Sequence, residues 1–338
     1  MEPYPCSSSR TIQENYYELS SSLSFIIGLL GNLIALAILW NNRLNIKKSK
    51  KSVFYLLVTG LTIVNLTGKV MVSPVVLGAY SKNQTLVQLA GTDTLCQFFA
   101  FCMTFFGLAP TIILLALALD CWLALARPFT YHKHITNKVG FLVPLVSCIF
   151  SLAFCSLPFV GIGEFVQYCP GTWCFIQMTT KNSNNLTYSV LYGTAMGLLV
   201  IAIVIFKLDI MRRRYSMYRK QNIRNVIGTK VEHKPMNVKQ AGMGELDHLL
   251  LLALMTVLFM ICSLPLTGRV YVRVFSDEAN DYYDLIILRL LCVNSIVNPW
   301  VFIIFRTSTF HMQVNRLCSK LNTKNQTNPQ LPEELPKL

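Results

Sequence analysis

Charged residues are scarce in this sequence. Only 14% of its 338 residues carry a charge, whereas 53% are hydrophobic and the mean hydropathy is +0.47. A soluble protein normally carries charge on about a quarter of its residues, so this composition excludes an ordinary soluble domain and favours a membrane protein. The start of the chain also lacks a basic segment followed by an apolar core, and we therefore predict no cleavable signal peptide.

Catalytic motifs are missing as well. The chain contains no H-E-x-x-H, no G-x-S-x-G and no pair of aspartates inside an apolar segment. These absences predict that it is not an enzyme and needs neither a metal nor another cofactor. The sequence also shows neither the internal repeats nor the interrupted helices that secondary transporters contain. An organic-anion transporter stays a remote alternative, because cations do occur within the apolar segments.

Seven apolar segments of about 20 residues or more are long enough to cross a bilayer as helices. They cover residues 20–41, 53–80, 94–126, 138–161, 187–211, 246–273 and 282–305. We therefore predict an all-α membrane protein whose seven-transmembrane helix bundle spans residues 20–305. Residues 1–19 precede the bundle, residues 306–318 form a short amphipathic eighth helix after it, and residues 319–338 are a tail. The third segment is apolar on every side, which favours a central place in the bundle.

Lysine and arginine gather in alternate connecting segments. NNRLNIKKSKK, at 41–51, and the segment that begins MRRRYSMYRK, at 211–220, are strongly basic. Because basic loops stay in the cytoplasm, we predict a multi-pass plasma-membrane protein with an extracellular N-terminus and a cytoplasmic C-terminus. The net charge of +14 then follows from membrane topology, and no nucleic acid is expected as a partner. Asn83 and Asn185 head N-x-T sequons in predicted outer loops and are candidate glycosylation sites.

Four cysteines fall on the predicted outer side, where disulfides persist. Cys96 begins the third span and Cys174 lies in the second outer loop, so a bond between them would tie the loop to the helix. Cys6 and Cys169 are a second candidate pair.

Two cations lie inside apolar spans. Lys69 is in the second span and Arg289 in the seventh, both in the predicted outer half of the membrane, where the sequence places no carboxylate. A cation at that depth is costly and needs a partner or water. Lys69 could extend to the outer headgroups, and Arg289 could pair with backbone carbonyls or with a loop acid such as Glu164. The sharper hypothesis is an anionic ligand, because the planar fork of arginine fits a carboxylate and the apolar walls suit a fatty-acid derivative.

Polar and helix-breaking residues mark the spans at greater depth. Asn65 and Asn298 belong to a predicted polar layer in the first, second and seventh spans, where side-chain amides bond between helices. Pro265 and Pro299 free backbone carbonyls and permit kinks, which would let the inner ends of the spans move.

Several motifs resemble those of rhodopsin-like G-protein-coupled receptors, over essentially the whole chain. They include GN in the first span, CSLP at 262–265 and NPWVF at 298–302. PGTWCFI at 170–176 is similar to the outer-loop motif of prostanoid receptors, as is an arginine nine residues before N-P-W. SPVVLGAY and ELDHLLLLALMTVLF look like the DP type within that family.

The resemblance implies roles for the matching positions. Arg289 would pair with the carboxylate of the ligand, Thr172 and Tyr80 would form hydrogen bonds near it, and Lys69 would contact the polar ring or carboxyl region. The implied function is a receptor for prostaglandin D2 or a related lipid carboxylate. The implied signal passes through a heterotrimeric G protein of the stimulatory class and raises cyclic AMP. The alternative is a DP-type paralogue with drifted ligand choice or weakened coupling.

The sequence departs from the wider family at three places. Asp120-Cys121-Trp122 lacks the arginine of the usual acidic-Arg-aromatic triplet, as the DP type itself does. Asn65 stands where the family typically has a sodium-binding aspartate, and Asn298 stands where prostanoid receptors usually have aspartate. Because both acids are replaced by neutral amides, we predict a weak sodium effect on agonist binding.

Overall fold

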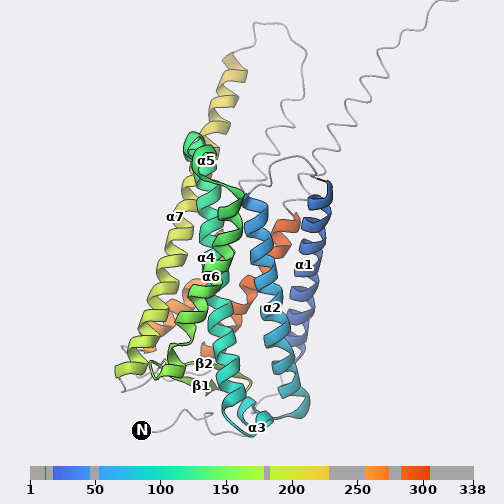
Figure 1. The fold of residues 1–338 in the computed structure, drawn as a ribbon, viewed down its shortest axis with the longest axis vertical. Coiled ribbons are helices and arrows are strands. Elements are labelled where there is room, and N and C mark those ends of the chain that lie inside the picture. The colour runs from blue at the N-terminus through green and yellow to red at the C-terminus, as the bar shows by residue number, and fades with distance from the viewer. Residues whose placement is uncertain are drawn as a thin grey trace, which may run out of the picture.

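The computed structural model describes residue 12 and residues 18–45, 53–178, 183–227, 256–273 and 283–304. Long helices make up most of these residues and run together in one bundle (Figure 1). Five of them are α1 (Glu18–Asn45), α2 (Val53–Lys82), α4 (Thr94–Ala126), α6 (Asn137–Cys155) and α7 (Ser183–Ile227). Two more are named here by their residue ranges, helix 256–273 and helix 283–304.

Short elements lie at the two ends of the bundle. They are α3 (Leu86–Ala90), α5 (Pro128–His134), the 3-10 helix η1 (Leu157–Val160), β1 (Phe165–Tyr168) and β2 (Trp173–Ile176). The two strands and α3 lie at one end, which we call the hairpin end (Figure 1). The opposite end holds α5 and the far part of α7, and we call it the basic end.

The structure confirms the predicted bundle. Within the described residues, six helices are long and apolar enough to cross a membrane, and their ranges follow the predicted spans closely. Helix 256–273 is the described part of the remaining predicted span. The predicted amphipathic helix at 306–318 and the tail at 319–338 lie outside the described residues, as does most of the segment at 1–19.

The fifth span is longer than the sequence pattern indicated. We predicted an end near residue 211 and a basic loop after it, but α7 continues without interruption to Ile227. The added residues, RRRYSMYRKQNIRNVI, contain neither glycine nor proline; five of the 16 are arginine, and lysine, methionine and glutamine each occur once. These residue types favour helix, so the backbone has no local reason to leave the helix where the apolar segment stops.

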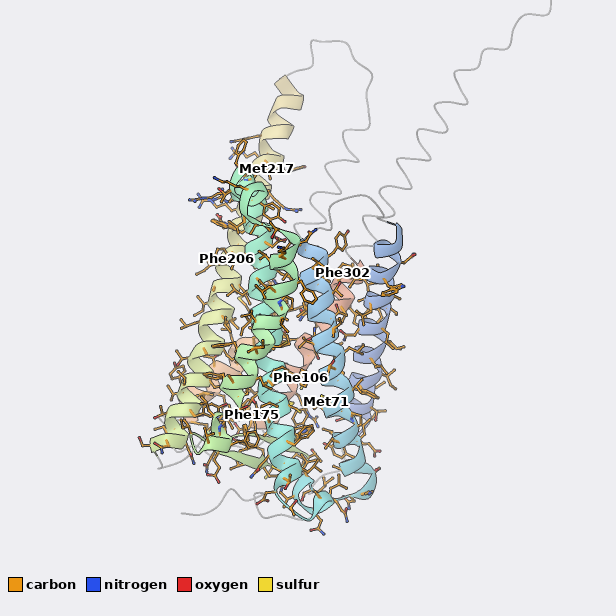
Figure 2. The ribbon with its side chains drawn as sticks, viewed as in Figure 1. Met71, Phe106, Phe175, Phe206, Met217 and Phe302 are labelled. Atoms are coloured by element: carbon orange, nitrogen blue, oxygen red, sulfur yellow. A yellow bond between two sulfur atoms is a disulfide. The ribbon has the colours of Figure 1, made fainter. Side chains whose placement is uncertain are left out.

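The third span, α4, lies at the centre of the bundle as predicted. It contacts α2, α6, α7 and both strands, and residues on several of its faces are buried. Close packing against α2 depends on Gly68, because a methyl group there would come within 2.8 Å of the Phe106 ring. Phe106 lies at the middle of the bundle in Figure 2, whereas Met217 is on the part of α7 near the basic end.

A β-hairpin covers the hairpin end of the bundle. Strands β1 and β2 pair antiparallel, and all four residues of β2 are buried. A disulfide joins Cys174 of β2 to Cys96 of α4, with an S–S distance of 2.00 Å, which confirms the first predicted bridge. Cys169 is also disulfide-bonded; its predicted partner, Cys6, lies outside the described residues, so that pairing stays a prediction. In the turn, Gly171 has a φ of 101° and its carbonyl accepts from the Leu86 amide at 2.9 Å.

The two candidate glycosylation sites have different surroundings. Asn185 is 7% exposed, and its Nδ2 donates to Glu164 Oε2 and to Gln177 Oε1, both at 2.9 Å. An N-linked glycan replaces one of the two hydrogens on this nitrogen, so it would remove at least one of these bonds and would have to fit at a buried position. Asn83 is exposed. We therefore expect a glycan at Asn83 and none at Asn185.

Electrophoretic mobility before and after glycosidase treatment checks this expectation. Asn83→Gln should abolish the mobility shift, and Thr187→Ala should leave it unchanged. Thr187→Ala removes the second sequon while keeping the Asn185 bonds, which makes it the better control. A glycosidase-sensitive shift that persists in Asn83→Gln and disappears in Thr187→Ala would show that Asn185 is modified.

Candidate ligand-binding cavity

A cavity of about 280 Å³ lies among α1, α2, α4 and helix 283–304, and Trp173 of the hairpin closes part of it. Its walls are largely apolar, with Val72, Val76, Met103 and Phe106 among them. Two basic residues line the cavity, Lys69 and Arg289, and none of the described residues that line it is acidic. The cavity therefore combines apolar walls with an excess of positive charge.

Arg289 lies next to two of the other residues that the resemblance singled out. Its Nη2 donates to the Tyr80 hydroxyl at 3.3 Å, and its Nη1 donates to Ser20 Oγ at 3.5 Å. Thr172 also donates to the Tyr80 hydroxyl, at 3.2 Å. Neither Tyr80 nor Thr172 is among the residues that line the cavity, so both adjoin it through Arg289. Three of the four predicted ligand-binding residues thus form one hydrogen-bonded chain.

Lys69 points into the protein. Its side chain is buried at 7% exposure, and Nζ donates to the carbonyl oxygen of Cys292 at 3.4 Å. The stem lies against Gly28 of α1, where a methyl group would come within 3.0 Å of Lys69 Cε. The alternative in which Lys69 extends to the headgroups is therefore wrong. Cys292 follows Arg289 by less than one helical turn, so the two cations occupy successive levels of one cavity.

The proposed loop partner for Arg289 is engaged elsewhere. Glu164 Oε2 accepts the bond from Asn185 at 2.9 Å, and the carbonyl of Glu164 accepts from the Gln177 amide at 2.9 Å. Glu164 is not among the residues that line the cavity. The structure therefore assigns Glu164 to the base of the hairpin.

The polar layer forms the floor of the cavity. Asn32 Nδ2 donates to the Ser295 carbonyl at 3.1 Å, which links the first and seventh spans as predicted. Asn294 Nδ2 donates to Ser263 Oγ at 2.7 Å, so the layer also reaches helix 256–273. Asn65 and Asn298 line the cavity, and neither Nδ2 atom has a hydrogen-bond partner among the described residues. These amides are neutral, and the weak sodium effect stays a prediction.

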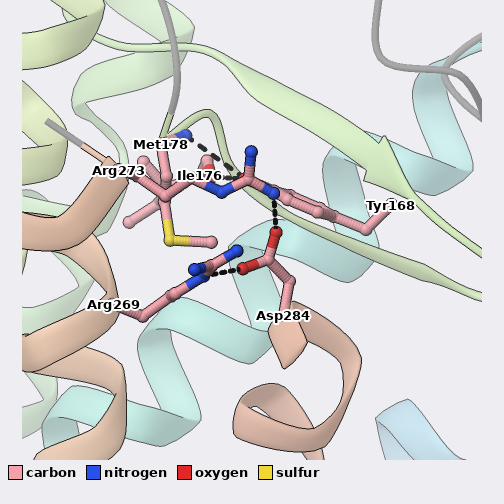
Figure 3. A network of polar contacts seen from close by, with 6 residues as sticks. All are labelled: Tyr168, Ile176, Met178, Arg269, Arg273 and Asp284. Atoms are coloured by element: carbon pink, nitrogen blue, oxygen red, sulfur yellow. Dashed lines mark hydrogen bonds and ion pairs between the residues drawn. The ribbon is translucent and has the colours of Figure 1, made fainter. Parts of the chain in front are cut away.

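A buried ionic cluster near the hairpin end was not predicted from the sequence. Asp284 falls within the seventh predicted span, and the structure places it in helix 283–304 with a fully buried side chain. Arg269 Nε donates to Asp284 Oδ1 at 2.6 Å, and Arg273 Nη2 contacts Oδ2 (Figure 3). A signal was present in the spacing, because Arg269 and Arg273 are four residues apart on one face of an apolar helix, where buried cations need a partner.

Polar contacts also join the helices at the basic end. Asp120, buried at 7% exposure, accepts from the Tyr131 hydroxyl of α5 at 3.0 Å. Burial and the neighbouring carboxylate raise the pKa of Tyr131 to about 12, so its hydroxyl keeps the proton that it donates. Trp122 Nε1 donates to Asp209 of α7 at 2.7 Å, and Arg213 donates to the same oxygen at 2.7 Å. Pro265 and Pro299 lie within helices 256–273 and 283–304, respectively.

Comparisons with known proteins agree with this architecture. The family described as "7 transmembrane receptor (rhodopsin family)" matches residues 31–302. The crystal structure of squid rhodopsin is 14% identical and has a TM-score of 0.68, covering 89% of this chain and 81% of that chain, which is a likeness in fold. The chain therefore belongs to the rhodopsin-like seven-transmembrane receptors, which are multi-pass proteins of the plasma membrane and not enzymes.

Relatives at higher sequence identity show to which group of rhodopsin-like receptors the chain belongs. The prostaglandin D2 receptor of Homo sapiens is 46% identical over 334 residues, which cover 93% of each chain. The prostaglandin D2 receptor-like protein of Rattus norvegicus is 47% identical over 331 residues, covering 92% of each. The prostaglandin E2 receptor EP2 subtype of Homo sapiens is 38% identical, covering 90% of this chain and 87% of that receptor. Within the rhodopsin-like class, the chain is a prostanoid receptor.

Proposed function

We propose that this receptor binds prostaglandin D2, or a closely related prostanoid, in the cavity that Lys69 and Arg289 line. The observation that carries the proposal is the charge of that cavity: two cations, apolar walls and no acidic residue among the described residues of its lining. A lipid with one carboxylate brings a negative charge to these two cations and an apolar chain to the walls. The names of the relatives at 46% and 47% identity support prostaglandin D2 as the first ligand to test.

The contacts of the cavity suggest how the ligand lies. The guanidinium of Arg289 accommodates the carboxylate, since charge-assisted bonds from a planar fork are strong and directional. Tyr80 donates its hydroxyl proton to the same group, and Thr172 holds Tyr80 in place through the 3.2 Å bond. Lys69, one level further from the hairpin, donates to an oxygen of the prostanoid ring. The apolar chains lie along Val72, Val76 and Met103.

For signalling, we propose coupling to a G protein of the stimulatory class and a rise in cyclic AMP. The hairpin end then faces outward and the basic end faces the cytoplasm, as the distribution of lysine and arginine predicts. The basic turns of α7 after residue 211 offer an acidic partner a positive surface at that end. A receptor with weakened coupling is the second candidate, because neutral Asn65 and Asn298 take the places of acids in the polar layer.

A ligand panel tests both candidates. Cells that express the chain are given prostaglandins D2, E2, F2α and I2, and competition binding and cyclic AMP are read from the same cells. The expected result is highest affinity for prostaglandin D2 with a rise in cyclic AMP. High affinity without cyclic AMP supports the candidate with weakened coupling, and no specific binding of any of the four excludes both. Uptake of labelled ligand into vesicles, in the absence of a cyclic AMP response, would instead support anion transport.

A further inference from the structure

The cluster of Arg269, Arg273 and Asp284 joins two helices near the hairpin end. Each carboxylate oxygen takes a different arginine: Oδ1 accepts from Arg269 at 2.6 Å and Oδ2 contacts Arg273 (Figure 3). The exposed fractions are 8% for Arg269, 2% for Arg273 and 0% for Asp284. Asp284 is therefore the anion between two buried cations of helix 256–273.

Such a cluster fixes the relative position of two helices more than it adds to the free energy of unfolding. Removing charges from water offsets much of their mutual attraction, but loss of one partner leaves a buried charge without compensation. The arrangement therefore favours one relative position of the two helices over neighbouring ones. The two arginines are one turn apart and bind different oxygens of Asp284. They therefore fix the rotation of helix 283–304 about its axis, and its position along that axis, relative to helix 256–273.

The same helix carries Arg289. Arg289 lies five positions after Asp284 in the sequence, which is about 7.5 Å along the helix axis. The contacts of Arg289 with Tyr80 and Ser20 are long, at 3.3 Å and 3.5 Å, whereas the contact between Arg269 and Asp284 is 2.6 Å. Leu285 and Leu288, between the two positions, are buried in the core, so this part of the helix is packed in place. Asp284 itself is not among the residues that line the cavity.

We propose that the Arg269–Asp284–Arg273 cluster positions Arg289 for the carboxylate of the ligand. Asp284 is then a positioning residue for a site that it does not line. The cluster also lies close to the hairpin, since Figure 3 places it with Tyr168, Ile176 and Met178, where the Tyr168 hydroxyl donates to the Ile176 carbonyl at 2.7 Å. The inference rests on the proposed function, because it requires an acid ligand at Arg289.

The test compares an acid with its ester. Full-length receptor carrying Asp284→Asn is assayed in membranes for competition by prostaglandin D2 and by its methyl ester. We expect affinity for the acid to fall about tenfold while affinity for the ester changes less than about twofold, because only the acid uses the charge of Arg289. A role in stability alone would lower the number of binding sites or weaken both ligands equally, and either result overturns the proposal.

Two further variants make the test independent of folding losses. Glu18→Gln removes an exposed negative charge near the hairpin end and should change neither affinity. The double exchange Arg273→Asp with Asp284→Arg keeps two cations and one anion in the cluster, and it should restore most of the preference for the acid. If this exchange does not restore the preference that Asp284→Asn removes, the ionic cluster does not position Arg289.

The result is also separable from a failure of the proposed function. If the wild-type receptor shows no preference for the acid, or if Arg289→Ala leaves that preference intact, the proposed ligand site is wrong and the inference fails with it. If Arg289→Ala abolishes the preference and Asp284→Asn does not change it, the site stands and only the positioning role is wrong.

Discussion

Arg289→Ala is expected to weaken the binding of prostaglandin D2 by about 100-fold, because truncation of one partner of a buried charge pair leaves the other uncompensated. Lys69→Ala should weaken binding by about tenfold, as expected for one lost hydrogen bond from a charged donor. Competition binding on membranes measures both effects. Arg289→Lys should fall between wild type and Arg289→Ala, since an ammonium keeps the charge but loses the planar fork.

The matched control is Lys82→Ala. Lys82 lies in the last turn of the same helix as Lys69 and is exposed, so its removal changes the net charge without changing the cavity. It should leave affinity within about twofold. Should Arg289→Ala and Lys69→Ala also stay within about twofold, the assignment of both cations to the ligand site is wrong.

Cys96→Ala is the second change with a large expected effect. The bond from Cys96 to Cys174 holds β2 against α4, and β2 carries Trp173, which lines the cavity. Removal of a native disulfide costs about 2–5 kcal/mol. We expect specific binding at the cell surface to fall by about tenfold or more and the unfolding temperature of purified receptor to fall by several degrees.

Combining Cys96→Ala with Cys174→Ala separates the effect of losing the disulfide from the effect of losing the packing of the two side chains. Cys96→Ala and Cys174→Ala each break the same bond, so their combination should be no worse than either alone. Cys102→Ala is the control, because Cys102 is a buried free cysteine on the same helix and should affect binding little. Additive losses from the two single changes would mean that packing at these positions, and not the disulfide, is responsible.

Much of the fold was predictable because a membrane simplifies the problem. Apolar length identifies the spans, and lysine and arginine suggest their direction, without reference to tertiary contacts. The Lys69 and Arg289 pair was predictable for the same reason, since a cation in an apolar span needs an explanation. The bridge between Cys96 and Cys174 was predicted from their places at the start of the third span and in the second outer loop, where a bond ties the loop to the helix.

Other features depend on contacts that no local pattern specifies. No local pattern singled out Asp284, and only the packing of two helices brings it to Arg269 and Arg273. The sequon at Asn185 is intact as a motif, yet tertiary packing buries its nitrogen between Glu164 and Gln177. The predicted end of the fifth span, at residue 211, was 16 residues short of the end of α7 at Ile227. The loss of apolar character marks the edge of the membrane and not the end of a helix.

The uninterrupted course of α7 has a mechanical consequence. At the helical rise, its 45 residues extend about 67 Å, roughly twice the thickness of the hydrocarbon core. No loop or proline divides this helix between the residues beside the hairpin and the turns beyond Asp209. If the helix tilts as a stiff rod at the hairpin end, its arginine-rich end at 212–227 would move sideways with it, over a distance that grows with the length of the helix.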